Sequence, residues 1–252
     1  MTEAGTSHLD PEKYLANLGA DGPGLAAAAE TDLTAPVPGC PDWNVAALVG
    51  HTALIHRWVS GLLGARATEP MSRRDIGPPP EGGAVLEWYR AGLAGLMTAF
   101  GATGPDEPVW NFITGVSPAR FWYRRMAAET AVHRWDAQSA VGTPAPIDPA
   151  LAVDGIDELL GTFAPRLLAG DGPRPDLGGS LHVHSTDAEG EWTVEQHEDG
   201  WRVVPGHAKG DAAVRGPASD LFLALWGRPT IDALEVFGDR RVLDRWREIV
   251  RF

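Results

Sequence analysis

The sequence predicts an α+β protein in which an N-terminal four-helix bundle precedes a smaller α/β domain with an antiparallel sheet. In the first half, apolar residues recur every three or four positions, which is typical of amphipathic helices. In the second half, apolar and polar residues alternate in several short segments, which is typical of strands. The proline-rich stretch 142–149 separates the two patterns because proline cannot continue a helix. We therefore predict two domains, residues 1–145 and 146–252.

The first domain is predicted to consist of helices joined by loops. Asp10 with Pro11, and Ser117 with Pro118, are typical pairs of an N-cap and a first-turn proline. Asn44 is a further N-cap, and it follows a loop that three prolines between residues 35 and 41 make rigid. The predicted helices span residues 10–30, 44–62, 85–100 and 117–140. Helices of this length joined by loops are typical of a bundle.

The second domain is predicted to mix strands with helices. Its alternating segments are bounded by the turn-forming pairs Glu189-Gly190 and Asp199-Gly200. The predicted strands span residues 181–184, 192–195, 201–204 and 213–215. The predicted helices span residues 151–168, 221–226 and 242–249, and a Gly/Pro-rich stretch occupies 169–179.

The composition excludes several classes of function. The 252-residue chain carries 34 acidic and 21 basic side chains, and its net charge of −13 would repel a phosphate backbone. No run of about 18 apolar residues is present, and the N-terminus lacks the pattern of a secretory signal. Cys40 is the single cysteine, so no internal disulfide can form. We expect a cytoplasmic monomer or small homo-oligomer that binds neither nucleic acid nor membranes.

A candidate metal site lies on the predicted bundle helices. Glu129 and His133 are four residues apart on a mostly apolar helical face, so their side chains can meet. A buried carboxylate needs a partner, and a metal cation is one. His51 lies on the apolar face of the second helix, and two nitrogens with one oxygen match an open catalytic zinc pattern. A helix-stabilising Glu–His pair and a hydrogen-bonded core histidine also fit these residues. His56 lies about 140° around the helix from His51 and is not expected to reach the same point.

Four segments resemble the mycothiol-dependent maleylpyruvate isomerase family. Two lie in the first domain, CPDWNVAALVGHTALIHRW (40–58) and RRMAAETAVHRWDA (124–137). Two lie in the second, VRGPASDLFLALWGR (214–228) and ALEVFGDRRVLDRW (233–246). They span nearly the whole chain in the order that the family has. The resemblance implies a DinB-like bundle followed by a C-terminal domain similar to sterol-carrier folds.

The resemblance also implies cofactors and ligands. It implies a divalent metal, usually zinc, held by His51, Glu129 and His133, and mycothiol as the thiol cofactor or co-substrate. The chain departs from the family at Ala128, where many relatives have a histidine before the metal-binding glutamate. This departure weakens inferences about substrate and rate more than the inference of metal binding. A C-terminal arginine that holds an anionic substrate is expected at Arg228, because a guanidinium grips a carboxylate through two hydrogen bonds.

Several other residues have competing interpretations. Arg240 and Arg241 are alternative candidates for the arginine that binds the substrate. Asp136 either supports the metal site or forms a salt bridge with Arg134 or Arg125. His182 and His184 have a spacing that permits metal binding, but we interpret them as a solvated sheet face. Cys40 is interpreted as structural, and Trp58 or Trp122 as core residues that can also line the pocket.

These observations predict a metal-dependent and mycothiol-dependent enzyme. Its substrate would be a small electrophile such as an unsaturated carboxylate. The reaction would be a cis–trans isomerisation of the maleylpyruvate type or a thiol S-transfer. A thiol-dependent hydrolase or conjugating enzyme for xenobiotics is a further possibility. A non-enzymatic alternative is a metal-binding stress protein or a carrier of a small apolar ligand.

Overall fold

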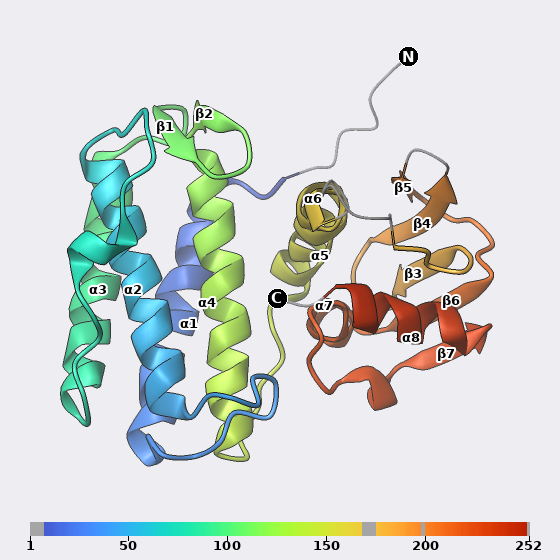
Figure 1. The fold of residues 1–252 in the computed structure, drawn as a ribbon, viewed down its shortest axis with the longest axis horizontal. Coiled ribbons are helices and arrows are strands. Elements are labelled where there is room, and N and C mark those ends of the chain that lie inside the picture. The colour runs from blue at the N-terminus through green and yellow to red at the C-terminus, as the bar shows by residue number, and fades with distance from the viewer. Residues whose placement is uncertain (1–7, 168–174, 198–199, 251–252) are drawn as a thin grey trace. The chain divides into compact units, whose positions relative to one another are not determined.

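The computed structural model describes residues 8–167, 175–197 and 200–250 (Figure 1). These residues divide into two compact units, and the division falls between Ile147 and Asp148. The first unit contains residues 9–147, and the second contains residue 8 together with residues 148–250. Helices dominate the first unit, and the second combines helices with a sheet. The predicted α+β fold class is confirmed.

Long helices build the first unit, and they match the predicted ones closely. They are α1 (Pro11–Thr31), α2 (Val45–Gly64), α3 (Ala84–Ala102) and α4 (Arg120–Ala140). Helix α1 packs mainly against α4, and α2 mainly against α3. Asn44 caps α2 as predicted, because its Oδ1 accepts a hydrogen bond from the backbone N–H of Ala47 at 2.9 Å. Asp10 precedes α1, but its side chain makes no capping hydrogen bond.

The start of α4 corrects one prediction. Ser117 and Pro118 do not open the helix, because they belong to β2 (Gly115–Pro118), which pairs with β1 (Pro108–Asn111) in an antiparallel hairpin. Asn111 Oδ1 accepts hydrogen bonds from the backbone N–H groups of Ile113 and Thr114, which fixes the turn. A Ser-Pro pair is typical of a helix start, but it is also compatible with the end of an edge strand. The pair alone therefore does not distinguish the two structures.

The core of the first unit is filled by aliphatic and aromatic side chains from all four helices. Its fully buried large members include Leu18, Leu25, Leu48, Leu62, Tyr89, Leu96, Phe100, Trp122 and Met126. Trp58, Trp110 and Trp122 pack edge to face, with ring centroids of Trp58 and Trp122 5.4 Å apart. Trp58 and Trp122 therefore belong to an aromatic cluster of the bundle.

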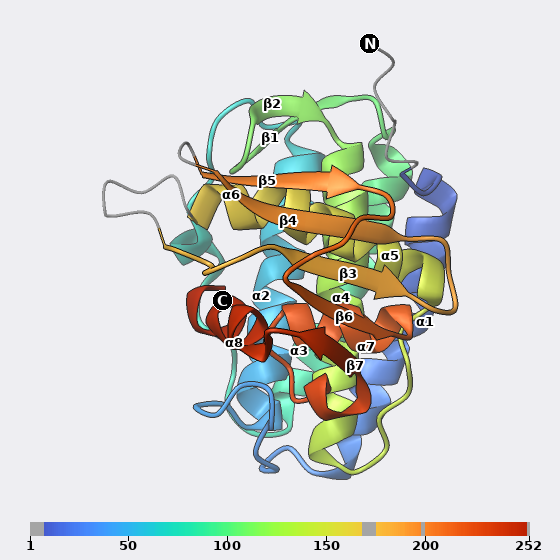
Figure 2. The ribbon, with the colours of Figure 1, turned by 90° about the vertical axis from the view of Figure 1, so that its right-hand side faces the viewer.

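A five-stranded sheet forms the centre of the second unit (Figure 2). Its strands are β3 (Leu181–Ser185), β4 (Glu191–His197), β5 (Gly200–Pro205), β6 (Ala212–Gly216) and β7 (Glu235–Gly238). The strand order is β5-β4-β3-β6-β7. The sheet is antiparallel except for β3 and β6, which run parallel. Strand β7 escaped prediction because its four residues show no clear alternation.

Helices cover one face of this sheet. They are α5 (Pro149–Glu158), α6 (Ala164–Leu167), α7 (Ala218–Leu225) and α8 (Arg240–Ile249), and a π-helical turn, Leu159–Phe163, joins α5 to α6. Trp192 Nε1 donates a hydrogen bond to Asp157 of α5, so the residues of β4 that share its face point toward the helices. The described residues leave out Leu168 at the end of a predicted helix, residues 169–174 of the Gly/Pro-rich stretch, and Asp199 of the predicted turn. Within the described ranges, no helix is long and apolar enough to cross a bilayer.

Candidate metal centre

Helices α2 and α4 bring His51, Glu129 and His133 together, and we call these three residues the helix cluster. Nε2 of His51 lies 3.3 Å from Oε1 of Glu129, and Nε2 of His133 lies 3.3 Å from the same oxygen. One ligand atom from each residue lies within 4.8 Å of the other two. The pair on α4 meets because residues four apart lie on adjacent turns of one helical face. His51 joins them because α2 packs against α4.

The electrostatics of the helix cluster favour a charged carboxylate. Burial alone would raise the pKa of Glu129, but the charge of His133 and the hydrogen bonds from both histidines outweigh it. The pKa of Glu129 is therefore well below its usual range. Burial alone would lower the pKa of His133, but Glu129 and Asp136 raise it to about 9. An ionised carboxylate is the form that binds a cation, and a cation here would compete with a proton at His133.

Three neighbouring side chains hold the helix cluster in place. Oδ2 of the fully buried Asp136 lies 3.0 Å from Nδ1 of His133, so a proton on Nδ1 leaves Nε2 to face Glu129. Arg125 Nη2 donates a hydrogen bond to Glu129 Oε2 at 3.2 Å. The Trp43 ring lies 4.8 Å from the His51 ring and 6.2 Å from the His133 ring. The four-residue spacing from Glu129 could have singled out Arg125, whereas no sequence signal marks the loop residue Trp43.

His56 lies outside the helix cluster, as its helical position predicts. Its Nε2 is 2.9 Å from Thr130 Oγ1, and its ring packs 5.6 Å from that of Tyr89. The side chain is fully buried, and burial is the main reason that its pKa falls to about 3. His56 is therefore a neutral core histidine.

The donor set of the helix cluster fits a divalent metal. Two imidazole nitrogens and one carboxylate oxygen are the ligands of open catalytic zinc sites, in which a further position accepts water or substrate. The Asp136–His133 contact is the kind of outer support that metal-binding histidines have. His51 and Glu129 are partly exposed, with 31% and 21% of their side chains accessible, so a small molecule can approach them.

Comparison with known proteins identifies the family. The model of the mycothiol maleylpyruvate isomerase N-terminal domain matches residues 16–138. The model of the C-terminal domain of the same family matches residues 150–245. The chain belongs to the mycothiol-dependent maleylpyruvate isomerase family. Both halves of the family's architecture are present, in the family's order.

Solved structures share the fold of this isomerase family. A crystal structure of the mycothiol-dependent maleylpyruvate isomerase matches with a TM-score of 0.64 at 15% identity, and its histidine-to-alanine mutant with 0.66 at 16%. Each alignment covers 90% of this chain and 93% of the other. Identity this low shows the shared fold alone. No curated protein matches the sequence.

The remaining predicted residues have diverse surroundings. Arg228 is buried, and its Nη1 donates a hydrogen bond to the backbone carbonyl of Trp226 at 2.9 Å. Ala128, the position of the expected departure from the family, is fully buried. Cys40 is half-buried and packs against the bundle core. The prediction that His182 lies on a solvated sheet face is wrong, because that side chain is buried.

Proposed function

We propose that this chain is a metal-dependent enzyme that uses mycothiol to act on a small electrophile such as an unsaturated carboxylate. The observation that carries the proposal is the convergence of His51, Glu129 and His133 on one point in a family named for its thiol-dependent isomerisation. The reaction is a cis–trans isomerisation of the maleylpyruvate type or a thiol S-transfer. We assign His51, Glu129 and His133 as ligands of a divalent ion, with zinc favoured by the two imidazoles and the carboxylate.

A bound divalent ion supplies the positive charge that stabilises a thiolate, and a thiolate supplies reversible addition to an activated alkene. The residues of the chain supply the setting for that chemistry. Asp136 holds the His133 imidazole in one tautomer, and Arg125 holds one oxygen of Glu129 so that the other faces the histidines. The Trp43 ring packs beside the two imidazole rings. These contacts organise the site before a substrate arrives.

The test compares metal content with thiol-dependent turnover. We expect the full-length protein to bind one divalent ion at the helix cluster and to convert maleylpyruvate only when mycothiol is present. His51→Ala and Glu129→Ala should each lose that ion and that conversion. His197→Ala is the matched control, because His197 on β4 contacts Glu195 and takes no part in the helix cluster. Full metal content and activity in both helix-cluster variants would overturn the proposal.

The product distinguishes the two reaction types. Release of the trans isomer with unchanged mycothiol identifies an isomerase, and accumulation of the thioether adduct identifies a transferase. Mass spectrometry of the reaction mixture separates these outcomes.

Arg228 is proposed to hold the substrate carboxylate, on the strength of its place in the family's C-terminal motif. Arg228→Lys keeps the positive charge but removes the paired geometry of the guanidinium. We expect KM for the carboxylate substrate to rise about 10-fold to 100-fold, since a charge-assisted hydrogen bond contributes roughly 1.5–3 kcal/mol. Arg215→Lys is the control, because Arg215 is exposed and pairs with Glu235 at 2.8 Å. Equal KM values in the two variants would exclude Arg228.

A further inference from the structure

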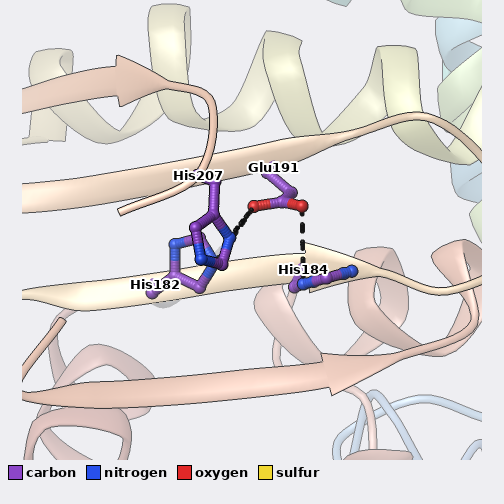
Figure 3. A group of neighbouring side chains, drawn as sticks. All are labelled: His182, His184, Glu191 and His207. Atoms are coloured by element: carbon purple, nitrogen blue, oxygen red, sulfur yellow. Dashed lines mark hydrogen bonds and ion pairs between the residues drawn. The ribbon is translucent and has the colours of Figure 1, made fainter. Parts of the chain in front are cut away.

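Three histidines and a glutamate meet on the sheet of the second unit, and we call His182, His184, Glu191 and His207 the sheet cluster (Figure 3). We propose that the sheet cluster is a second binding site for a divalent transition metal such as zinc. It shares no residue with the helix cluster and lies in the other unit, so the proposal does not depend on the proposed function.

The strand register places three of the four residues on one face. His182 and His184 are two residues apart on β3, so their side chains point to the same side of the sheet. In the antiparallel pairing with β4, His184 lies opposite Glu191, and His182 lies opposite Thr193. Directly opposed residues have side chains close enough to interact. This face is opposite to the one on which Trp192 reaches helix α5.

The chain after β5 brings the fourth residue to the same place. Strand β5 pairs with β4 so that Pro205 lies opposite Trp192, and the next residue, Gly206, donates its backbone N–H to the Glu191 carbonyl at 2.8 Å. Gly206 has a φ of +100°, which glycine adopts without a side-chain clash. His207 then turns back over the sheet, and its Nδ1 lies 2.8 Å from Glu191 Oε2.

The distances suit a shared ion. Glu191 stands at the centre, with Oε2 3.5 Å from His182 Nε2 and Oε1 3.5 Å from His184 Nδ1. One ligand atom from each of the four residues lies within 4.8 Å of the others. Zinc bound at about 2.0–2.1 Å in a tetrahedron separates its ligands by roughly 3.3 Å. Small side-chain rotations therefore suffice to bring the four atoms to coordinating distance.

His182 gives an independent indication of a ligand. The residue is only 5% exposed, and its Nε2 has no hydrogen-bond partner although it faces the cluster. Its Nδ1 lies 3.1 Å from Oγ1 of Thr193, which is itself buried. When Nδ1 donates to this oxygen, Nε2 carries the lone pair that a metal requires. A buried nitrogen without a hydrogen bond is uncommon in native proteins, and coordination to a cation would satisfy it.

The donor set indicates both the class of ion and its role. Three imidazoles favour zinc, copper or nickel over magnesium or calcium, which prefer oxygen ligands. Four protein ligands complete a tetrahedron and leave no position for a substrate, which is typical of structural sites. The ion would tie β3, β4 and the segment after β5 together.

The decisive experiment counts zinc ions bound by the full-length chain in competition with a chromophoric chelator. In the His51→Ala/Glu129→Ala double variant, we expect one zinc ion to remain bound and to raise the melting temperature. Adding His184→Ala should weaken that binding at least about 100-fold and abolish the rise in melting temperature. His182→Asn tests the buried ligand and should weaken zinc binding as well. It is made separately because a substitution in the interior can also change folding. His197→Ala is the matched control, since it removes a partly exposed histidine beside Glu195 on β4.

The results separate the two sites. Loss of zinc with His184→Ala but not with His197→Ala supports the sheet cluster. If the double variant binds no zinc, or if His184→Ala and His197→Ala weaken binding equally, the second site is excluded. Should the double variant fail to fold, the wild-type chain provides the same test, because His184→Ala then lowers its zinc content by about one ion and His197→Ala leaves it unchanged. None of these outcomes decides the proposed function, which depends on turnover and on the variants of the helix cluster.

Discussion

The helix cluster and the sheet cluster both combine histidines with one glutamate, but different elements hold them. In the helix cluster, Glu129 and His133 follow from a spacing within α4, and α2 supplies His51. In the sheet cluster, the residues come from two strands and from the segment after a third. Two buried charged residues, Asp136 and Arg125, contact the ligands of the helix cluster. In the sheet cluster, the neutral side chain of Thr193 contacts His182.

This difference suggests a division of roles. Charged neighbours can tune a ligand's basicity and orient it, which chemistry at a metal needs. A neutral hydroxyl orients a ligand without adding charge, which is enough for a structural ion. Three ligands leave room for a reactant, and four do not. The two clusters therefore offer a direct comparison between a proposed reactive centre and a proposed structural one.

The largest expected effect is on turnover. Glu129→Gln preserves the shape of the side chain but removes the negative charge from the helix cluster. We expect kcat/KM for the thiol-dependent reaction to fall about 1000-fold, because a bound metal contributes several kcal/mol to catalysis. Steady-state kinetics with added mycothiol measure this change. Activity within about threefold of wild type would remove the reactive role from the helix cluster.

A smaller effect is expected from the residues that support the ligands. Asp136→Asn should weaken zinc binding at the helix cluster about 10-fold to 100-fold, because the carboxylate that orients His133 becomes a neutral amide. Thr193→Val should weaken binding at the sheet cluster by less than this, since only a neutral hydrogen bond to His182 is lost. Chelator competition measures both affinities. Equal losses would contradict the proposed difference in electrostatic support.

The next prediction concerns acid stability of the bundle behind the helix cluster. The pKa of His56 is about 3 in the folded chain and 6.5 as the ordinary value, so the unfolded chain binds more protons between these limits. The contribution of neutral His56 to the free energy of unfolding is therefore fully present above pH 6.5 and is lost as the pH falls toward 3. We expect this loss to be about 1.4 kcal/mol per pH unit for the one proton involved.

Chemical denaturation of the chelator-treated protein at several pH values tests this prediction. His56→Gln keeps a polar side chain for Thr130 but does not titrate, so its stability should fall less steeply with acid than that of wild type. Parallel pH profiles of the two proteins would show that His56 is not the titrating group.

The smallest effect is expected at the N-terminus of α2. Asn44→Ala removes the cap and should lower the free energy of unfolding by about 1 kcal/mol. Asn44→Asp retains an oxygen acceptor and serves as the control. Denaturant titration measures the change. A loss as large in the control would mean that the amide has a role other than capping.

The same comparison shows what a sequence reveals. Helical spacing predicted α1, α2, α3 and most of α4, because an amphipathic face repeats every 3.6 residues along the chain itself. That periodicity also selected Glu129 and His133 on one face and set His56 apart from His51. The contact between α2 and α4 needed the further assumption of a bundle. The assignment of the helix cluster as metal ligands stays a prediction.

The sheet cluster was beyond the same approach for a physical reason. Only His182 and His184 are close in sequence, and although their spacing permits metal binding, we interpreted them as a solvated sheet face. Glu191 joins them through the register of β3 with β4, and His207 through a turn after β5. Registers and turns depend on tertiary packing, which a single sequence does not display. The parallel pairing of β3 with β6 was missed for the same reason.

Helix α4 carries Arg125, Glu129, His133 and Asp136 on consecutive turns. One residue inserted between Glu129 and His133 would rotate the downstream imidazole by about 100° away from the carboxylate. An insertion in the loop between α2 and α3 would leave that alignment untouched. Changes in chain length that preserve this alignment are therefore confined to the loops. In a library of one-residue insertions, we expect variants with insertions in the loops to retain metal binding and variants with insertions between Glu129 and His133 to lose it.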